Sequence, residues 1–423
     1  MTAAGLTSTE QKPRCAPMTR TGDTGFQPRP MKALFQRNGA WADIMETYPL
    51  RPVEIEVVTK MLACGTPLTG SREWRCSNPE CTHHRYIHQS CHGRGCPTCA
   101  KKATDLWIST MMARLPDTPC QHGTFTMPDT LWPLFEANRW LLNGLFSLAA
   151  DNLLYAAELR GLTIGIFGAL HTYGRQLNWN CHIHLSWTTG GISEHGAWKK
   201  MTFALPKVRA RWIWNVRQYL LSAWESLTLP PQLAHIRDYD EWKRFILSQG
   251  KNEQGEVYWH VYFAKPTKHA GQTAKYLGRY LKKLPVSGAR LAHYDGGSRI
   301  TLRFLDHRTG RHETLSLSQH ELILRLIKHI PEKHFRMVRY FGFLANRVVG
   351  KLLPQVRKAL GQDEVKKAAR VTYATLSQGL LNTDPFACLL CGAKMAFGRA
   401  LPAVPLEKLI ANAGAIARMS YTG

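Results

Sequence analysis

Five of the eleven cysteines in this 423-residue chain fall within one short segment, "CSNPECTHHRYIHQSCHGRGCPTC". Four residues separate Cys76 from Cys81, fourteen separate Cys81 from Cys96, and two separate Cys96 from Cys99. Two closely spaced cysteine pairs at this distance are typical of tetrahedral zinc, because each pair occupies a tight turn that points both sulfurs inward. The segment therefore predicts a structural zinc site formed by Cys76, Cys81, Cys96 and Cys99. A reduced, buried cysteine cluster is the alternative.

The full ligand set of this site is left open by the sequence. Cys91 is a possible extra ligand, and several histidines lie nearby: His83, His84, His88 and His92. Far along the chain, Cys388 and Cys391 precede Gly392 and resemble one half of another zinc turn. No second half follows them, so a distant partner pair and an ordinary short turn both remain open.

The segment "CHIHLSW" alternates as a β-strand does. In a strand, His182, His184 and Ser186 share one face, whereas the other face is made by Cys181, Ile183, Leu185 and Trp187. His171 ends the preceding strand-like segment, "TIGIFGALH", and two adjacent antiparallel strands would bring it alongside. Three imidazoles with open coordination positions are typical of a catalytic metal site. The alternative for His171 is a hydrogen-bonded histidine at a strand end.

Tyr276 and Tyr280 lie four residues apart in "TAKYLGRYLKK" and would share one face of a helix. Basic residues form an arc beside them: Lys275, Arg279, Lys282 and Lys283. Two half-buried aromatic residues with exposed hydroxyls would give the same pattern. Beside a histidine metal site, however, a tyrosine hydroxyl could attack a phosphodiester that the metal polarises, giving a covalent phosphotyrosine.

The net charge of +25, from 55 Lys and Arg against 30 Asp and Glu, indicates a polyanionic partner, most often nucleic acid. The chain starts without a secretory signal, and the most apolar stretch is interrupted by Asn143, Asp151 and Asn152. We therefore expect a cytoplasmic, nucleoid-associated protein of the bacterial type with no membrane partner.

The order of elements predicts an α+β fold with a mainly antiparallel sheet, because strand-like segments alternate with helical ones and one clear hairpin spans 299–318. Residues 319–370 are expected to be helical and basic. We divide the chain into a disordered arm (1–30), a zinc-binding DNA-binding domain (31–115), a catalytic domain (116–318), a basic helical DNA-binding region (319–385) and a tail with a CxxC turn (386–423).

Taken together, the motifs resemble a known family. They are "CGTPLTG…WRC…C…SC…GCPTC", "GTFTMP", "LHTYGRQLNWNCHIH", "AKYLGRYLKK", "VRYFGFLANR" and "CLLCGAKM", in this order from about residue 33 to 395. Their joint presence is similar to the rolling-circle transposases with two catalytic tyrosines, of the IS91 type, within the HUH (His, hydrophobic, His) endonucleases. The resemblance implies a central antiparallel sheet with flanking helices.

The same resemblance implies roles for individual residues. His182 and His184 match the HUH metal pair, His171 sits where related relaxases carry a third histidine, and Tyr276 and Tyr280 match the paired nucleophiles. The implied reaction is nicking of single-stranded DNA at transposon ends, giving a 5′-phosphotyrosine and a free 3′-hydroxyl, followed by transfer to target DNA. Three imidazoles alone suggest zinc or another borderline metal, whereas the family implies Mg²⁺ or Mn²⁺.

Some points depart from the family or stay open. The family often has a proline before the HUH triplet, where this chain has Cys181.

We expect DNA contacts from Arg339 as well as from the basic arc beside the tyrosines. A replication initiator or relaxase would use the same chemistry, and a nonenzymatic zinc-containing nucleic-acid-binding protein could use the tyrosines as stacking platforms. The sequence does not identify the DNA sites, the order in which the two tyrosines act or the oligomeric state.

Overall fold

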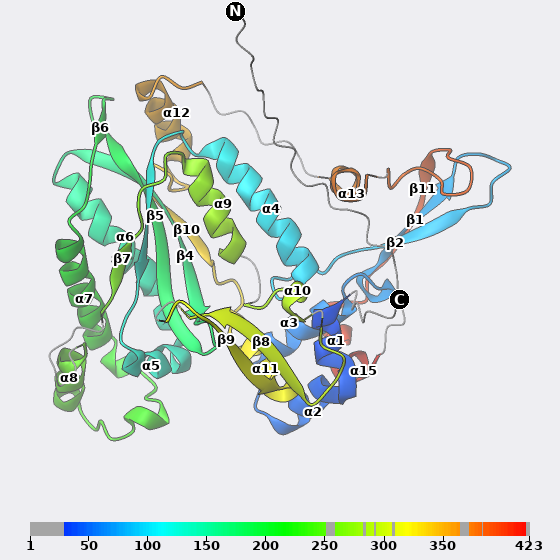
Figure 1. Cartoon of the computed structure of the whole chain (residues 1–423), viewed down its shortest axis with the longest axis horizontal. Coiled ribbons are helices and arrows are strands. Elements are labelled where there is room, and N and C mark those ends of the chain that lie inside the picture. Colours follow the sequence, from blue (N-terminus) through cyan, green and yellow to red (C-terminus); the bar gives the residue numbers. More distant parts are fainter. Residues whose placement is uncertain are drawn as a thin grey trace, which may run out of the picture.

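The computed structural model describes residues 29–250, 259–281, 285–291, 293–306, 309–363, 372–382 and 384–419. A central antiparallel sheet lies between two layers of helices, a second helical cluster lies beside it, and a narrow ribbon of strands projects from one end (Figure 1). The predicted α+β class is confirmed. The predicted disordered arm falls outside the described residues, apart from its last two positions.

The central sheet has the strand order β10-β4-β5-β3-β7, with β6 paired to β5. Each of these strand pairs is antiparallel. β4 and β5 are the long strands, and both predicted strand segments lie within them. The strands are β3 (Cys120–Phe125), β4 (Leu162–Tyr173), β5 (Trp179–Ser193), β6 (Trp198–Lys200), β7 (Val261–Phe263) and β10 (Val338–Gly342). β7 covers three residues, and residues 251–258 lie outside the described residues.

One face of the sheet packs on a large apolar core. Ile183, Leu185 and Trp187 of β5 are fully buried in it, as the alternation of the segment predicts. The helices of this layer are α5 (Trp132–Ala137), α6 (Leu142–Glu158), α7 (Leu205–Ser222) and α8 (Tyr239–Ser248). Asn152 is buried within α6 and donates a hydrogen bond to the Val208 carbonyl, which explains a polar residue in so apolar a helix. In the described part of the chain, every helix is too short or too polar to cross a membrane.

The other face carries the histidines and is covered by α4 (Pro97–Arg114), α9 (Ala270–Leu281) and α12 (Val349–Ala359). Phe167 of β4 packs with Trp107 of α4 and Ala274 of α9 in a smaller core. A Cβ atom at Gly278 would lie 2.4 Å from Ile108 Cγ1, so glycine allows α9 to approach α4 closely. The α9 helix is therefore held against both α4 and this face of the sheet.

A second core joins both ends of the chain. Trp41, Leu62, Leu326 and Ile416 are buried together in it. Its elements are α1 (Pro30–Gln36), α2 (Ala40–Thr47), α3 (Pro52–Ala63), α10 (Gly288–Leu291), β8 (Arg299–Leu305), β9 (His312–Ser318), α11 (Gln319–Lys328), α14 (Leu406–Ala411) and α15 (Ala413–Arg418). The β8–β9 pair is the predicted hairpin. This packing crosses the boundaries that we drew at 115, 318 and 385.

The projecting ribbon is a three-stranded sheet of order β11-β1-β2, with bounds β1 (Ser71–Cys76), β2 (His84–His88) and β11 (Met395–Leu401). It pairs a segment near the start of the chain with one near its end (Figure 1). α13 (Tyr373–Leu381) precedes β11. Short 3-10 turns complete the described structure: Arg37–Gly39, Pro67–Thr69, Asp129–Leu131, Arg139–Leu141, Trp224–Ser226 and Pro231–Leu233.

The expectation of a helical region over 319–370 is wrong in its middle. α11 and α12 are helices, but Val338–Gly342 forms β10, the edge strand that pairs with β4. The segment "VRYFG" is rich in β-branched and aromatic residues, which fit a pleated surface, and the open edge of β4 provides its partner. Residues 364–370, the end of that prediction, lie outside the described residues.

β10 ends at Gly342, where only glycine is tolerated. Its φ is +58°, and a Cβ atom there would lie 1.7 Å from the Ile164 carbonyl oxygen, which accepts a hydrogen bond from Phe343 N–H. We expect Gly342→Ala to destabilise the fold by more than about 2 kcal/mol, since both backbone strain and a backbone clash oppose it. The thermal midpoint measures this effect.

Gly350, in α12, is the matched control because a Cβ atom there meets nothing within 4 Å. Gly350→Ala should leave the midpoint unchanged or raise it slightly, as alanine favours helix. Equal midpoints for the two variants would contradict the account of Gly342.

Candidate functional site

The paired strands β4 and β5 bring three histidines together. His171 of β4 lies directly opposite His182 of β5, and His184 follows two residues later on the same face. One ring nitrogen from each lies within 4.8 Å of the others. His171 is buried and the other two are half-buried. The structure thus places all three predicted residues around one point on the sheet.

Hydrogen bonds to Nδ1 orient two of the rings. His182 Nδ1 lies 2.9 Å from the Asn180 carbonyl oxygen, so its N–H donates there. His184 Nδ1 lies 3.0 Å from His122 Nε2 and 3.3 Å from Thr124 Oγ1. These contacts occupy Nδ1 in both rings and leave Nε2 as the nitrogen free to bind a metal, the usual arrangement for ligating histidines.

His122 is a site residue that sequence reasoning missed. It lies on β3 opposite Ser186 of β5, with Nδ1 3.0 Å from Ser186 Oγ, and its ring stacks on His184 with centroids 5.1 Å apart. His122 therefore connects the ring of His184 to the Ser186 hydroxyl and helps to hold that ring in place. The one signal in the sequence is the position of His122 directly before the motif "GTFTMP", but only the β3–β5 register shows that this residue lies beside the histidines.

Burial keeps these imidazoles neutral near pH 7. It lowers the pKa of His182 and of His122 to about 4, and it lowers the pKa values of His171 and His184 below the usual range. Neutral imidazole is the metal-binding form, so the residues suit a divalent ion. An ion held by three protein ligands would have further positions open for phosphate oxygens or water, unlike one in a closed structural site.

Cys181, which stands where the family often has proline, does not enter the site. Its side chain is fully buried on the opposite face of the sheet, with Sγ 3.9 Å from the sulfur of Met127. Burial raises the pKa of the Cys181 thiol, so it stays protonated in the core. The substitution leaves the strand pairing at His182 intact.

An open cavity of about 300 Å³ lies beside His171. Its walls come from β4, from the loop after α11 (329–337) and from the zinc-binding region, where Val57 and Arg94 contribute. Basic residues of that loop, Lys333 and Arg336, border it and are exposed. The cavity therefore lies between the histidine site on the central sheet and the second core, which contains α3 and α11.

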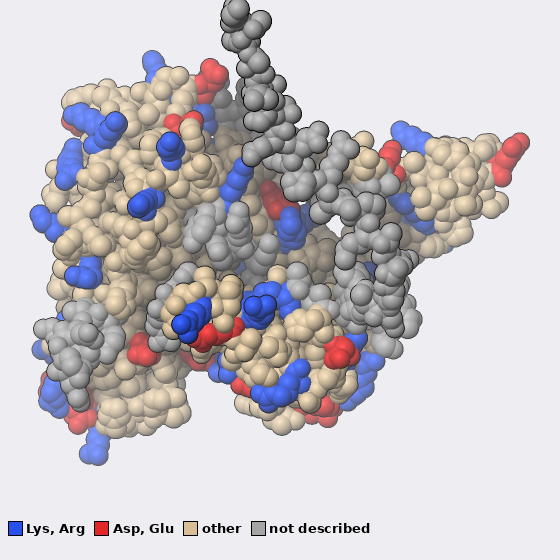
Figure 2. Space-filling view, viewed as in Figure 1, with Lys and Arg blue, Asp and Glu red and all other residues tan. Residues whose placement is uncertain are grey.

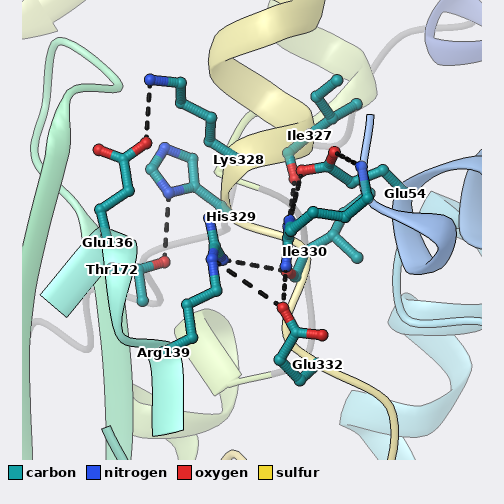
Figure 3. A network of polar contacts seen from close by, with 10 residues as sticks. Glu54, Glu136, Arg139, Thr172, Ile327, Lys328, His329, Ile330 and Glu332 are labelled. Carbon is teal, nitrogen blue, oxygen red and sulfur yellow. Dashed lines mark hydrogen bonds and ion pairs between the residues drawn. The ribbon is translucent and has the colours of Figure 1, made fainter. Parts of the chain in front are cut away.

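A polar network joins these two parts of the molecule (Figure 3). Arg51, before α3, binds Glu54, Glu332 and the Ile330 carbonyl, the last at 2.9 Å. Arg139 reaches the same carbonyl at 3.4 Å from the core side, and burial lowers its pKa to about 10. Two further contacts tie α11 and the residue after it to the core: Lys328 to Glu136 at 2.9 Å and His329 to Thr172 at 3.2 Å. The cavity wall is thus fixed from both sides.

Tyr276 and Tyr280 both lie on α9, the helix that covers the histidine face. The side chains of Tyr276, Arg279 and Tyr280 lie outside the described residues, as do Lys282 and Lys283 entirely. Lys275 is exposed. The helix is anchored by the buried Thr273, whose hydroxyl lies 2.8 Å from that of Thr267.

Arg339, a predicted DNA contact, makes internal contacts. Its guanidinium bonds the side chain of Asn143 at 2.5 Å and lies 4.6 Å from the ring centroid of Phe146. These contacts fasten β10 to α6, and burial lowers the pKa of Arg339. Elsewhere, Lys and Arg side chains are spread over the visible face of the molecule, with acidic side chains between them (Figure 2).

The predicted single zinc site is wrong in its grouping, because its four cysteines lie in two separate clusters. Cys96 and Cys99, at the start of α4, meet Cys91 and also Cys64 at the end of α3. The other cluster consists of Cys76, Cys81, Cys388 and Cys391. The possible extra ligand Cys91 belongs to the first cluster, and the unassigned CxxC turn belongs to the second.

The cause of the separation is the β1–β2 hairpin, which sequence reasoning did not predict. β1 carries the chain outward to Cys76, and β2 returns it from His84 to His88 before Cys91 is reached. A six-residue strand spans roughly 20 Å, which is too far for one zinc ion to bind both pairs.

Comparisons with known proteins agree with this architecture. A family model described as "Transposase zinc-binding domain" matches residues 36–127, and one described as "Putative transposase" matches residues 165–351. The chain is 50% identical over 411 residues to "Transposase for insertion sequence element IS801" of Pseudomonas savastanoi pv. phaseolicola, covering 97% of this chain and 99% of that protein. It is 30% identical over 342 residues to "Putative transposase y4qJ" of Sinorhizobium fredii, covering 78% and 84%. No solved structure matches the chain.

The contact between His122 and His184 yields a metal-binding prediction. We expect His122→Ala to weaken Mn²⁺ binding at the histidine site by about 10–100-fold, because loss of a partner that orients a ligand has this typical effect. Titration followed by electron paramagnetic resonance of free Mn²⁺ measures the affinity. His195→Ala is the control, since that histidine is exposed in the turn after β5. Unchanged affinity in His122→Ala would remove the orienting role.

The lowered pKa of His182 yields a pH prediction for protein without Mn²⁺ or Mg²⁺. Between about pH 6.5 and 4 the unfolded chain binds a proton at His182 that the folded chain does not. The free energy of unfolding therefore falls as pH drops through this window, on the order of 1–2 kcal/mol at pH 5 from this residue. Urea midpoints at pH 7 and pH 5 should fall more in the unmodified chain than in His182→Gln. Equal falls would refute the assignment.

Proposed function

This chain belongs to the IS91 family of transposases, and on that premise we propose that it nicks single-stranded DNA by metal-assisted attack of a tyrosine hydroxyl. The observation that carries the proposal is the convergence of His171, His182 and His184 on the sheet face that the tyrosine-bearing helix α9 covers. A transposase acts on DNA, and the net charge of +25 suits that substrate.

The histidines would hold a divalent ion, Mg²⁺ or Mn²⁺, through ring nitrogens that burial keeps unprotonated. When bound, such an ion polarises the scissile phosphate and stabilises the negative charge that develops on its oxygens. The contribution of the chain is to fix the three rings: the carbonyl of Asn180 orients His182, and His122 orients His184. With the three rings held in place, the remaining coordination positions of the ion would be open to the DNA.

The nucleophile would be the phenolic oxygen of Tyr276 or Tyr280. A free phenol has a pKa near 10, so it is mostly protonated at neutral pH and must lose its proton as it attacks. The new bond joins the tyrosine oxygen to phosphorus, and the bond from phosphorus to the 3′-oxygen breaks. That oxygen leaves as a 3′-hydroxyl after taking up a proton, and the 5′-phosphate stays on the tyrosine. Two tyrosines on one helix face permit two such linkages during strand transfer.

The zinc-binding region would present DNA to this centre. It lines part of the cavity next to His171, and the loop 329–337, which lines another part, carries Lys333 and Arg336. Exposed cations beside a metal site attract the phosphate backbone, and this contribution weakens as salt rises. On α9, Lys275 is also exposed. We assign a structural zinc ion to the first cysteine cluster, of Cys64, Cys91, Cys96 and Cys99.

A covalent-adduct assay tests the mechanism. The protein is incubated with labelled single-stranded DNA from an element end, with Mg²⁺ or Mn²⁺, and the labelled adduct is resolved under denaturing conditions. The double variant Tyr276→Phe/Tyr280→Phe should give no adduct, because both attacking oxygens are gone, and His182→Ala should lower nicking at least 100-fold. Both variants should bind DNA with nearly unchanged affinity, measured by fluorescence anisotropy.

Tyr155→Phe is the matched control, since this tyrosine is exposed on α6, in the layer on the other face of the sheet. It should form adduct at the normal rate. An adduct that survives in the double tyrosine variant would overturn the nucleophile assignment, and normal nicking by His182→Ala would overturn the metal site. DNA binding without adduct in the unmodified chain would favour a nonenzymatic binding protein.

A further inference from the structure

We propose that the chain holds a second structural zinc ion, bound by Cys76, Cys81, Cys388 and Cys391, that fastens β11 to the β1–β2 hairpin within the projecting ribbon. This inference goes beyond the proposed function and does not depend on it. The matching zinc-binding family model covers residues 36–127, which contain the whole first cluster but only half of the second. The other half comes from more than 250 residues further along the chain.

The distances between sulfurs suit a metal and not disulfides. Cys76 Sγ lies 3.4 Å from Cys391 Sγ, and Cys81 Sγ lies 3.8 Å from Cys388 Sγ. A disulfide requires about 2.05 Å. In a tetrahedral zinc site with bonds of about 2.3 Å, neighbouring sulfurs are roughly 3.8 Å apart. One sulfur from each of the four residues lies within 4.8 Å of the others, so the cluster is nearly the right size for zinc.

Both halves of the cluster are tight turns. In the first, Cys81 N–H donates to the Asn78 carbonyl at 3.0 Å, and Asn78 N–H points at Cys76 Sγ at 3.4 Å. In the second, Gly392 N–H donates to the Cys388 carbonyl at 2.9 Å, with a φ of +73° that suits glycine. Backbone N–H groups directed at sulfur favour the thiolate form, which is the form that binds zinc.

A histidine supports the second turn. His83 Nδ1 lies 3.1 Å from Cys388 Sγ and can donate a hydrogen bond to that sulfur. A donor to a ligating thiolate reduces its negative charge and orients it, as partners of metal ligands commonly do. His83 follows Cys81 by two residues, so the same turn supplies both a ligand and this donor.

The ribbon itself has too little core to be stable alone. Along β11 only Met395 is buried, and no residue of β2 is. Its main apolar contact is Trp74 against Phe386 and Phe397, at centroid distances of 4.4 and 5.9 Å. Small sheets without a core usually need a disulfide or a metal for stability. A zinc ion at the end of the ribbon would supply it, since zinc binding adds directly to folding free energy.

The strand register places the two turns at the same end. Cys76 pairs with Met395 across β1 and β11, and beyond the strands Ser77 N–H donates to the Lys394 carbonyl at 3.0 Å. The pairing therefore aligns the two halves of the site, and the ion in turn locks the pairing. After β11 the chain continues into α14 and α15, which pack in the core with α3.

Metal content tests the proposal. The purified full-length chain, dialysed free of loose metal, should contain two zinc ions per molecule by inductively coupled plasma mass spectrometry. Cys388→Ser/Cys391→Ser should contain one. The matched control is Leu389→Ser/Leu390→Ser, which changes two exposed residues between the same cysteines and should keep two. One zinc ion in the unmodified chain, or two in the cysteine variant, would overturn the proposal.

A second measurement avoids any variant that fails to fold. Replacing zinc with ¹¹³Cd in the unmodified chain should give two cadmium resonances, both at shifts typical of four sulfur ligands. A single such resonance, or a second one at a shift typical of mixed nitrogen and sulfur ligands, would overturn the four-cysteine assignment. Neither measurement uses DNA, so its outcome is independent of nicking.

Discussion

The antiparallel pairing of β4 with β5 is the constraint on which the rest of this molecule depends. Its register sets His171 opposite His182 and puts His184 on the same face. The same register sends Ile183 and Leu185 into the large core on the other side. A slip by one residue would exchange the two faces and bury imidazoles among leucines. The hydrophobic effect that folds the sheet therefore also fixes the arrangement of the three histidines.

The layer that covers the histidine face then determines their chemistry. α4 and α9 shield this face from water, which lowers the pKa values of the imidazoles and keeps them neutral. Neutral rings can still adopt different tautomers and orientations, and here the surrounding strands decide between them. His122 of β3 and the Asn180 carbonyl occupy Nδ1 of the two β5 histidines. Three adjacent strands therefore contribute to one site: β4 and β5 carry the three candidate metal ligands, and β3 carries the histidine that orients one of them.

The sequence predicts the parts of this design that depend on local pattern. Alternation identifies β5 and its polar face, and a short connection to the preceding strand predicts the partnership with His171. The paired tyrosines are placed on a helix by their spacing alone. These predictions succeed because neighbouring residues along the chain become neighbours in the structure, joined by a hairpin whose register is fixed by its apolar face.

Most of the failures involve residues far apart in the sequence. The ligand partners of Cys76 and Cys96 depend on the β1–β2 hairpin and on a strand from the far end of the chain. His122 joins the site only through the β3–β5 register, and β10 is a strand because β4 leaves an open edge for it. Spacing rules cannot find such partners, because a cysteine pair carries no mark of which other pair completes its site.

The first cysteine cluster connects the zinc-binding region physically with the histidines. Arg94 and Gly95 lie between its ligands Cys91 and Cys96, and both line the cavity beside His171. Arg94 donates to the Phe335 carbonyl at 3.1 Å, while a Cβ atom at Gly95 would lie 2.4 Å from Val57 Cγ1. This loop is therefore closely packed on both sides, and the cysteine cluster of Cys64, Cys91, Cys96 and Cys99 holds its two ends together. If this cluster binds the structural zinc ion that we propose, loss of the ion would reshape the wall of the cavity without touching a histidine.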